Sequence, residues 1–234
     1  MPIAENLARI RQQIADACGR AGRSEQDVAL MAVSKTHAAG RIVEAYNAGQ
    51  RLFGENRVQE FEAKASALAV LLPAGDAIFH LIGPLQANKT AKAALLFDAV
   101  DAVDSVRVAQ RLNEAAGKLG KVLPVLIEIK TSEEETKSGV KAGSAALDEL
   151  LERLGSLEHL RPAGLMTVPP YSDDLEAVRP YFRRLRELRD ALGGRYPALR
   201  LAELSMGMSN DFPVAIEEGS TCVRVGTAIF GARE

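Results

Sequence analysis

Short apolar segments alternate with amphipathic helical patterns along most of the chain, and this alternation limits the possible folds more than any other feature. The apolar segments are mostly unbroken runs, which is typical of strands covered on both faces, as in a parallel sheet. Strands are expected at 28–34, 51–53, 78–82, 98–101, 123–129, 161–167, 200–205 and 222–226. Between them, helices are expected at 39–48, 56–71, 85–96, 105–119, 144–154, 174–192 and 211–218.

Eight such units favour closure into a (β/α)8 barrel, for which 234 residues is a common length. A further helix is predicted over 3–20, where Ile3, Leu7 and Ile10 recur at helical spacing. We therefore expect an α/β fold, a single (β/α)8 TIM barrel with an extra N-terminal helix, in which residues 1–234 form one domain. A doubly wound open sheet is the alternative, because counting strands from one sequence is error-prone.

Composition argues against two classes of partner. The 29 Lys and Arg residues are balanced by 31 Asp and Glu, and aromatic residues make up only 5% of the chain. No basic surface or base-stacking platform for nucleic acid is therefore expected. No apolar run approaches the roughly 20 residues needed to cross a bilayer, and the charged N-terminal segment does not resemble a signal peptide. We expect a soluble cytoplasmic protein. Cys18 and Cys222 share no metal-binding spacing with the histidines, so no metal site is expected.

The first predicted strand ends in a lysine. The run VALMAVSK is apolar up to Ser34 and Lys35. The carboxyl ends of strands are where α/β barrels keep their chemistry, and a partly desolvated amine there can lose its proton and attack an aldehyde. The alternative is that Lys35 simply marks the exit of the strand into water.

Polar residues and glycines also follow the other predicted strands. The segments are GENRVQE at 54–60, His80 with IGPLQANK at 82–89, Asp104 with Ser105, Glu128 with Lys130, Met166 with Thr167, SMGMSND at 205–211 and VRVGTAIFG at 223–231. In a barrel these segments would all converge on one rim.

The last two of these segments have the features of a phosphate site. Gly207 permits close backbone approach, Ser205 and Ser209 offer hydroxyls, and Gly226 with Thr227 presents amides that open a helical turn. Unpaired N–H groups of this kind suit an anion, and the loops after the seventh and eighth strands are the usual phosphate position in such barrels. The alternative is that the glycines serve only tight turns.

Arg224 lies within the eighth predicted strand, two residues before Gly226. If its side chain points inside the barrel, an unpaired guanidinium would be costly, so it should meet a carboxylate or a polar ligand atom. A solvated arginine at a strand end is the alternative.

With Lys35 and the segments GENRVQE, FHLIGPLQANK, KSGV, GLMTV, SMGMSND and VRVGTAIFG in this order, the chain resembles the pyridoxal phosphate homeostasis protein family over roughly residues 5–231. The resemblance implies a barrel like the N-terminal domain of alanine racemase, holding pyridoxal 5′-phosphate (PLP) as a Schiff base. The positions that it assigns to the PLP site are Lys35, Asn56, His80, Ser205, Met206, Gly207, Ser209, Arg224, Gly226 and Thr227. Phe79 departs from the family pattern, since many relatives have tryptophan there, and this change should affect only packing.

Within this resemblance, Lys35 would carry the cofactor, the serines and glycines would contact the phosphate, and Arg224 would lie near the pyridine nitrogen. An arginine there cannot accept a proton, so it leaves the ring unprotonated and weakens PLP as an electron sink. Racemization needs a base on each face of the substrate. We expect no second domain to supply one, and only Tyr171 among the tyrosines could reach the rim.

The implied role is therefore intracellular PLP (vitamin B6) homeostasis, as a carrier or buffer without robust catalytic turnover. Two alternatives remain open: a minimal PLP enzyme, such as a weak racemase or lyase, and a barrel that binds another phosphorylated metabolite. PLP-dependent apo-enzymes are the candidate recipients, and a monomer and a weak homodimer fit equally well. Lys137 is a candidate second amine that would attract the phosphate or accept the aldehyde, although a solvated loop lysine is the simpler interpretation.

Overall fold

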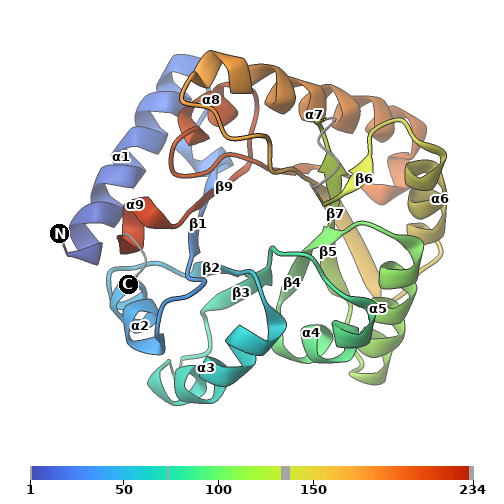
Figure 1. Ribbon diagram of the computed structural model, residues 1–234, viewed down its shortest axis with the longest axis horizontal. Helices are drawn as coiled ribbons and strands as arrows, with labels where there is room; N and C mark the ends of the chain where they lie inside the picture. The colour runs from blue at the N-terminus through green and yellow to red at the C-terminus, as the bar shows by residue number, and fades with distance from the viewer. Residues whose placement is uncertain (1, 73, 133–137, 232–234) are drawn as a thin grey trace.

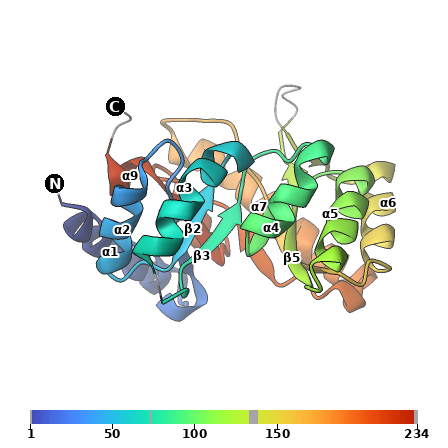
Figure 2. The ribbon, with the colours of Figure 1, turned by 90° about the horizontal axis from the view of Figure 1, so that it is seen from below.

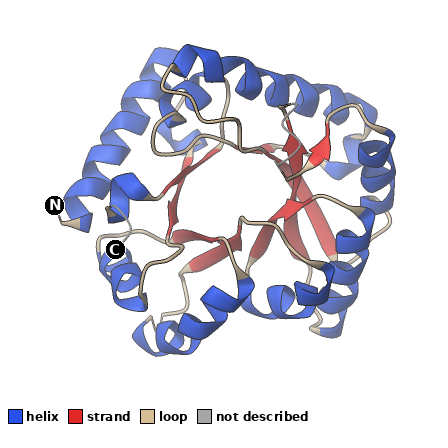
Figure 3. Ribbon diagram, viewed as in Figure 1, coloured by secondary structure: helices blue, strands red, loops and turns tan. Residues whose placement is uncertain are grey.

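Eight parallel strands close into a barrel, and helices form an outer ring around it (Figures 1 and 3). This computed structural model describes residues 2–72, 74–132 and 138–231. The barrel strands are β1 (Ala29–Val33), β2 (Leu52–Glu55), β3 (Ile78–Leu81), β4 (Ala99–Val103), β5 (Leu123–Lys130), β7 (Leu160–Met166), β8 (Glu203–Ser205) and β9 (Cys222–Val225). Their order around the barrel is β4-β3-β2-β1-β9-β8-β7-β5, and a β4–β5 pairing closes it. The expected barrel is confirmed, and the open sheet is excluded by this closing pair.

The helices run alongside the strands, as the side view in Figure 2 shows. They are α1 (Ile3–Ala21), α2 (Ala39–Asn47), α3 (Val58–Leu71), α4 (Thr90–Leu96), α5 (Val106–Lys118), α6 (Ala145–Leu154), α7 (Leu175–Arg195), α8 (Phe212–Glu217) and α9 (Thr227–Phe230). Short 3-10 turns lie at Glu25–Asp27, Ala87–Lys89 and Pro197–Leu199. A two-residue strand, β6 (Val140–Lys141), adds to β5 beside the barrel, and a segment that short carries no sequence pattern that would predict it.

The apolar core lies mainly between the strands and the helices. Each strand turns alternate side chains toward the helical ring, so the large buried residues form one continuous cluster there. Inside the barrel, the apolar cluster is small and consists of Ala102, Leu126, Ala163 and Met166. The interior therefore has room for polar side chains at both ends of the strands.

Helix α1, the expected extra helix, packs beside α8 and α9 (Figure 1). Asn6 Nδ2 donates to the Ile229 carbonyl at 2.9 Å, and Arg23 Nη1 donates to the carbonyls of Ile216 and Ser220, each at 2.8 Å. These bonds fix the segment that carries the last glycine-rich motif. Among the helices in the described ranges, none has the length and apolar character required to cross a membrane.

Candidate functional site

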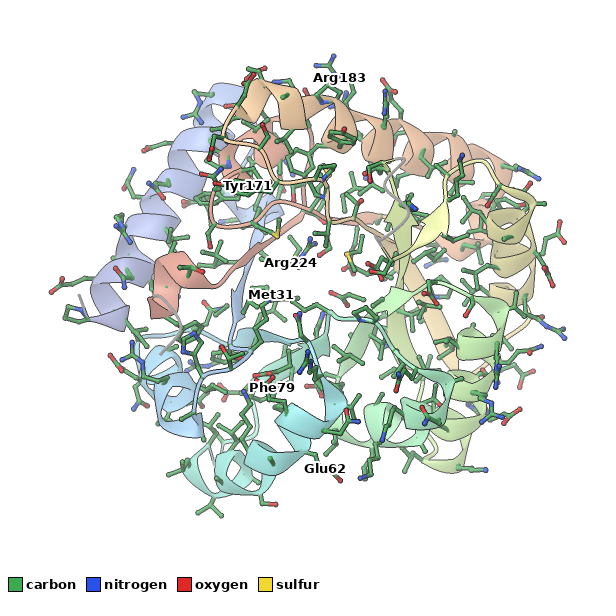
Figure 4. The ribbon with its side chains drawn as sticks, viewed as in Figure 1. Met31, Glu62, Phe79, Tyr171, Arg183 and Arg224 are labelled. Atoms are coloured by element: carbon green, nitrogen blue, oxygen red, sulfur yellow. The ribbon has the colours of Figure 1, made fainter. Side chains whose placement is uncertain are left out.

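A cavity of about 480 Å³ opens at the carboxyl ends of the strands. Its size is typical of small-molecule sites. The residues that line it are Val33, Lys35, Asn56, Ile82, Gly83, Pro84, Glu128, Ser138, Val168, Tyr171, Met208, Ser209, Asn210, Asp211, Arg224, Gly226 and Thr227. Figure 4 shows Arg224 and Met31 pointing into the barrel, whereas Arg183 points away from it. Six of the residues predicted for the site therefore meet here: Lys35, Asn56, Ser209, Arg224, Gly226 and Thr227.

The loop that carries Lys35 is held from behind by a buried ion pair. Lys64 Nζ on α3 lies 2.8 Å from Glu55 Oε1 and donates to the carbonyls of Ser34 and His37, each at 3.1 Å. Ser34 Oγ donates to the same Glu55 oxygen at 2.7 Å. Lys64 thus joins the start and the end of the loop around Lys35 and fixes its course.

The same loop contains a strained residue next to Lys35. Thr36 has a φ of 67°, a left-handed conformation that is rare for a β-branched residue. Its N–H donates to Glu60 Oε1, and the ring of His37 stacks on Phe230 with centroids 4.9 Å apart. Strain of this kind persists only where neighbouring contacts impose it, and it is concentrated at functional sites.

Lys64 was not predicted from the sequence. It follows Phe61 by three residues and precedes Leu68 by four, so it lies on the buried face of α3. A charged residue on an apolar helix face needs a buried partner, and this is the signal that could have identified it.

Two backbone N–H groups converge on Ser209 just after β9, the strand that pairs with β1 ahead of Lys35. Ser209 Oγ accepts from Gly226 N at 3.3 Å and lies 3.5 Å from Ala228 N. Gly207 has a φ of 95°, and a Cβ there would lie 2.6 Å from Ala215 Cβ, so the glycine lets this loop pack closely on α8. The two neighbouring loops thus bring a hydroxyl and two N–H groups to one place, and an anionic group could replace the Ser209 oxygen as the acceptor of these N–H groups.

Arg224 is buried inside the barrel with neutral partners. It is 4% exposed, and its Nη1 and Nη2 donate to Ser205 Oγ and the Thr167 carbonyl, each at 2.7 Å. Burial lowers the pKa of the guanidinium, although nearby acidic groups oppose the change. Arg224 therefore meets a hydroxyl and a carbonyl rather than a carboxylate, and it can donate to an electron-rich ligand atom.

Four of the predicted residues do not line this cavity. Ser205 is fully buried behind Arg224, Gly207 packs on α8, and Met206 lies in the apolar core outside the barrel. His80 points into the barrel one layer lower and lines a second cavity of about 390 Å³. Lys137 lies outside the residues that the structure describes.

The second cavity lies toward the amino ends of the strands. His80 Nδ1 is 3.1 Å from Asp101 Oδ1, and Arg161 and Glu203 line the same space. Burial alone would lower the pKa of His80, but the charge and hydrogen bond of Asp101 outweigh it and raise the pKa. This cavity is therefore built around a paired histidine and contains no lysine on its walls. In the described parts of the chain, no group of three or more His, Cys, Asp and Glu side chains could hold a metal ion.

Glu128 brings a carboxyl group to the Lys35 cavity. Its Oε1 accepts from Ser138 Oγ at 2.7 Å, whereas Oε2 is buried and has no hydrogen-bond partner among the described residues. Burial raises the pKa of Glu128, Asp104 adds to this effect, and Ser138 and Arg224 oppose it. The sequence places Glu128 near a strand end, but it gives no sign that one oxygen lacks a partner.

Tyr171 is the tyrosine that borders the cavity among the four in the chain, all of which the structure describes. Its side chain is largely exposed, and its hydroxyl donates to Asp173 at 2.6 Å. The hydrogen bond to Asp173 raises the pKa of Tyr171. A phenol held in this way is a poor base at neutral pH.

Comparisons with known proteins agree with this architecture. A family model described as "Alanine racemase, N-terminal domain" matches residues 5–234. The chain is 45% identical over 234 residues to the pyridoxal phosphate homeostasis protein of Aquifex aeolicus (strain VF5), with 100% of each chain covered. It is also 45% identical to that of Escherichia coli (strain K12), covering 99% of this chain and 97% of the relative.

Two solved structures have the same fold as this chain. PipY of Synechococcus elongatus PCC7942, with PLP bound, has a TM-score of 0.87 and 41% identity, covering 98% of this chain and 100% of PipY. An alanine racemase of Clostridium difficile 630 has a TM-score of 0.71 at 16% identity, covering 99% of this chain and 56% of the racemase. At that identity the racemase shares the fold alone.

Proposed function

The chain belongs to the family of pyridoxal phosphate homeostasis proteins, built on the fold of the alanine racemase N-terminal domain, and from this premise we propose that it binds PLP through Lys35. It would act as a carrier or buffer of the cofactor without robust catalytic turnover. The single observation that carries the proposal is the meeting of Lys35, Arg224 and the Ser209–Gly226 contact around one cavity.

The chemistry of the cavity fits this cofactor. PLP has a phosphate, an aldehyde and a pyridine nitrogen, and the walls offer N–H donors, a lysine amine and a buried guanidinium. Gly207 permits the loop that carries Ser209 to pack closely on α8, since a Cβ at position 207 would clash with Ala215. The cavity volume of about 480 Å³ is sufficient for a molecule of this size.

Each residue has a separate task in this proposal. Ser209 and Gly226 hold the phosphate with Thr227, and Asn56 lines the wall between β2 and β3. Lys35 supplies the amine, on a loop that Lys64 keeps in place. Bound PLP supplies an aldehyde that an amine can capture and, in PLP enzymes, an electron sink. Arg224 cannot take up a proton, so it would donate to the ring nitrogen and limit that sink.

Two features support a carrier rather than a racemase. A racemase needs a second base opposite the lysine, and Tyr171 has its hydroxyl committed to Asp173. The curated relatives are named homeostasis proteins, and the chain covers 97% or more of the lengths of those from Aquifex aeolicus and Escherichia coli. PLP-dependent apo-enzymes are the proposed recipients. The oligomeric state and the cytoplasmic location remain predictions from the sequence.

The test is to reduce the PLP-loaded protein with borohydride and to map the modified lysine by peptide mass spectrometry. We expect a pyridoxyl adduct at Lys35, loss of the absorbance band in Lys35→Ala, and an unchanged band in the surface control Lys92→Ala. A protein that yields no adduct at Lys35 would disprove the proposal and would favour a different phosphorylated ligand.

The remaining enzymatic alternative has its own measurement. The loaded protein is incubated with single L-amino acids in deuterated water, and the α-proton signal is followed by NMR. We expect exchange far below the turnover of about 1–10³ s⁻¹ that is typical of enzymes. Exchange in that range would replace the carrier by a minimal racemase or lyase.

A further inference from the structure

The cavity contains a carboxyl group that PLP binding alone does not explain. We propose that Glu128 is the proton-transfer residue that speeds both the capture of PLP by Lys35 and its release. This inference rests on the proposed function, because it assigns a role in the reaction between the Lys35 amine and the aldehyde. It concerns the rates of that reaction, whereas the proposed function concerns whether the bond forms at all.

The first support is the unusual state of the Glu128 side chain. It is 3% exposed, its Oε1 accepts from Ser138, and its Oε2 has no partner among the described residues. A buried carboxylate oxygen without a donor is costly, so the group holds a proton or receives a hydrogen bond from a water molecule or a ligand in the cavity. Either state requires a proton between Glu128 and the contents of the cavity.

The charged surroundings favour a proton on this group. Asp104, in the loop between β4 and α5, repels the carboxylate, and Asp211 lines the same cavity. Arg224 on β9 and Lys35 are the basic residues among the described residues of the cavity walls, and Arg224 only partly offsets the effect of burial on Glu128. The net effect is a pKa above the ordinary glutamate value, which brings proton exchange closer to neutral pH.

The other acidic and phenolic groups of the cavity each make a hydrogen bond within the protein. Asp211 Oδ1 accepts from Met208 N at 2.6 Å, where it holds the serine-containing loop. The Tyr171 hydroxyl donates to Asp173. Among the described residues that line the cavity, Glu128 is the carboxyl group with a buried oxygen that has no hydrogen-bond partner.

The proton balance of the reaction gives such a group two tasks. The Lys35 amine attacks the aldehyde carbon, a carbon–nitrogen bond forms, and the aldehyde oxygen leaves as water with both amine protons. The Glu128 carboxyl would donate its proton to the departing hydroxyl, and the resulting carboxylate would take up the proton that the nitrogen loses. The group ends as it began. Hydrolysis of the bond to Lys35 reverses each step, so the rates of capture and release should increase by the same factor.

The experiment follows capture and release separately in wild type and Glu128→Gln. Apo-protein is mixed rapidly with PLP and followed by absorbance, and loaded protein is diluted into excess of a PLP-trapping amine, between pH 5 and pH 9. General acid–base catalysis contributes about 10²–10⁴-fold, so we expect both rates to fall by about 10²-fold or more. The pH dependence should flatten, while borohydride-trapped occupancy at equilibrium changes little. Glu128→Asp should recover part of the pH dependence.

The matched control is Glu62→Gln, which removes an exposed glutamate on α3 and should leave both rates unchanged. Wild-type rates and pH profile in Glu128→Gln would overturn the inference, and so would a change in release alone, which indicates a binding contact.

If Glu128→Gln does not fold, Ser138→Ala keeps the carboxyl and removes a bond that lowers its pKa. The capture profile should then move to higher pH, and an unmoved profile would also refute the role. Failure of the proposed function would be recognised by a different result, because the wild-type protein would then form no pyridoxyl adduct at Lys35.

Discussion

Glu55 and Glu128 are two buried glutamates near strand ends, and they differ in whether a cationic side chain is paired with them. Each accepts from a serine hydroxyl at 2.7 Å through Oε1, and each has an Oε2 without a hydrogen-bond partner among the described residues. Glu55 also has the ammonium of Lys64 at 2.8 Å, whereas in the described part of the chain no ion pair involves Glu128. The paired carboxylate supports the loop of Lys35, and the unpaired one lines the cavity. The Glu55 carboxylate, which is paired with Lys64, stabilises the scaffold. The Glu128 carboxyl group, which has no cationic partner among the described residues, is available for the proposed proton transfer.

The largest effect should come from breaking the Glu55–Lys64 pair. Lys64→Met leaves the Glu55 charge buried without its cation, and we expect the free energy of unfolding to fall by about 3–5 kcal/mol. Burial already raises the pKa of Glu55, against the effects of Lys64 and Ser34. The loss should therefore shrink in acid, where Glu55 takes up a proton. Denaturant titrations at pH 4.5 and pH 7.5 measure both effects.

The control for this change is Lys92→Ala, which breaks an exposed pair with Glu62 at 2.7 Å. Exposed ion pairs contribute about 0–1 kcal/mol, so its unfolding curve should move little. Equal losses in Lys64→Met and Lys92→Ala would mean that the Glu55–Lys64 pair does not stabilise the scaffold.

The two serines provide a second, smaller contrast. Ser34 is fully buried, and Ser34→Ala should lower the free energy of unfolding by about 1.5–3 kcal/mol, as for a hydrogen bond to a charged group. Ser138 is exposed, and a hydrogen bond at an exposed site contributes little to stability because it competes with water, so we expect Ser138→Ala to lower the free energy of unfolding by less than about 1 kcal/mol. Thermal unfolding of the two apo variants compares them directly. A larger loss of stability in Ser138→Ala than in Ser34→Ala would contradict the assignment of Ser34 to the scaffold and of Ser138 to the cavity.

The smallest effect is a pH dependence of stability that Glu128→Gln should remove. Because the folded pKa of Glu128 is raised, wild type loses stability as the pH rises from the ordinary value of 4.5 through the folded pKa. Gln cannot ionise, so the variant should match wild type in acid and exceed it at neutral pH. Each unit of pKa shift corresponds to about 1.4 kcal/mol. Parallel unfolding curves for the two apo-proteins across pH 4–8 would contradict this sign.

The barrel could be predicted because strands buried on both faces leave unbroken apolar runs. Several predicted boundaries differ from the structure, and the helix expected at 85–96 begins only at Thr90, after a 3-10 turn. The strand expected at 200–205 begins at Glu203, since Leu199 ends a 3-10 turn and Arg200 adopts a φ of 50°. Helix α7 continues past 192 to Arg195 through two glycines, although glycine is a weak helix former.

The site was predictable only in part. The rule that strand ends carry the chemistry brought out Lys35, and the paired serine and glycine loops brought out Ser209 and Gly226. The sequence of a single strand does not show which layer of the barrel a side chain enters. His80 was expected at the rim with the end of the third strand, but it lies in the lower cavity. Lys64 belongs to a helix, where a buried charge is detectable only when the partner is known.

The pairing of β1 with β9 has a consequence for synthesis on the ribosome. Ala29 in β1 is in register with Cys222 in β9, and Asn6 bonds to the Ile229 carbonyl. The first strand and the first helix must therefore wait, with apolar faces uncovered, until almost the whole chain has emerged. A nascent chain can present Lys35 early, but the loops proposed to hold the phosphate, around Ser209 and Gly226, follow it by most of the length of the barrel. If PLP binds as proposed, loading therefore requires a chain in which β9 has already joined β1.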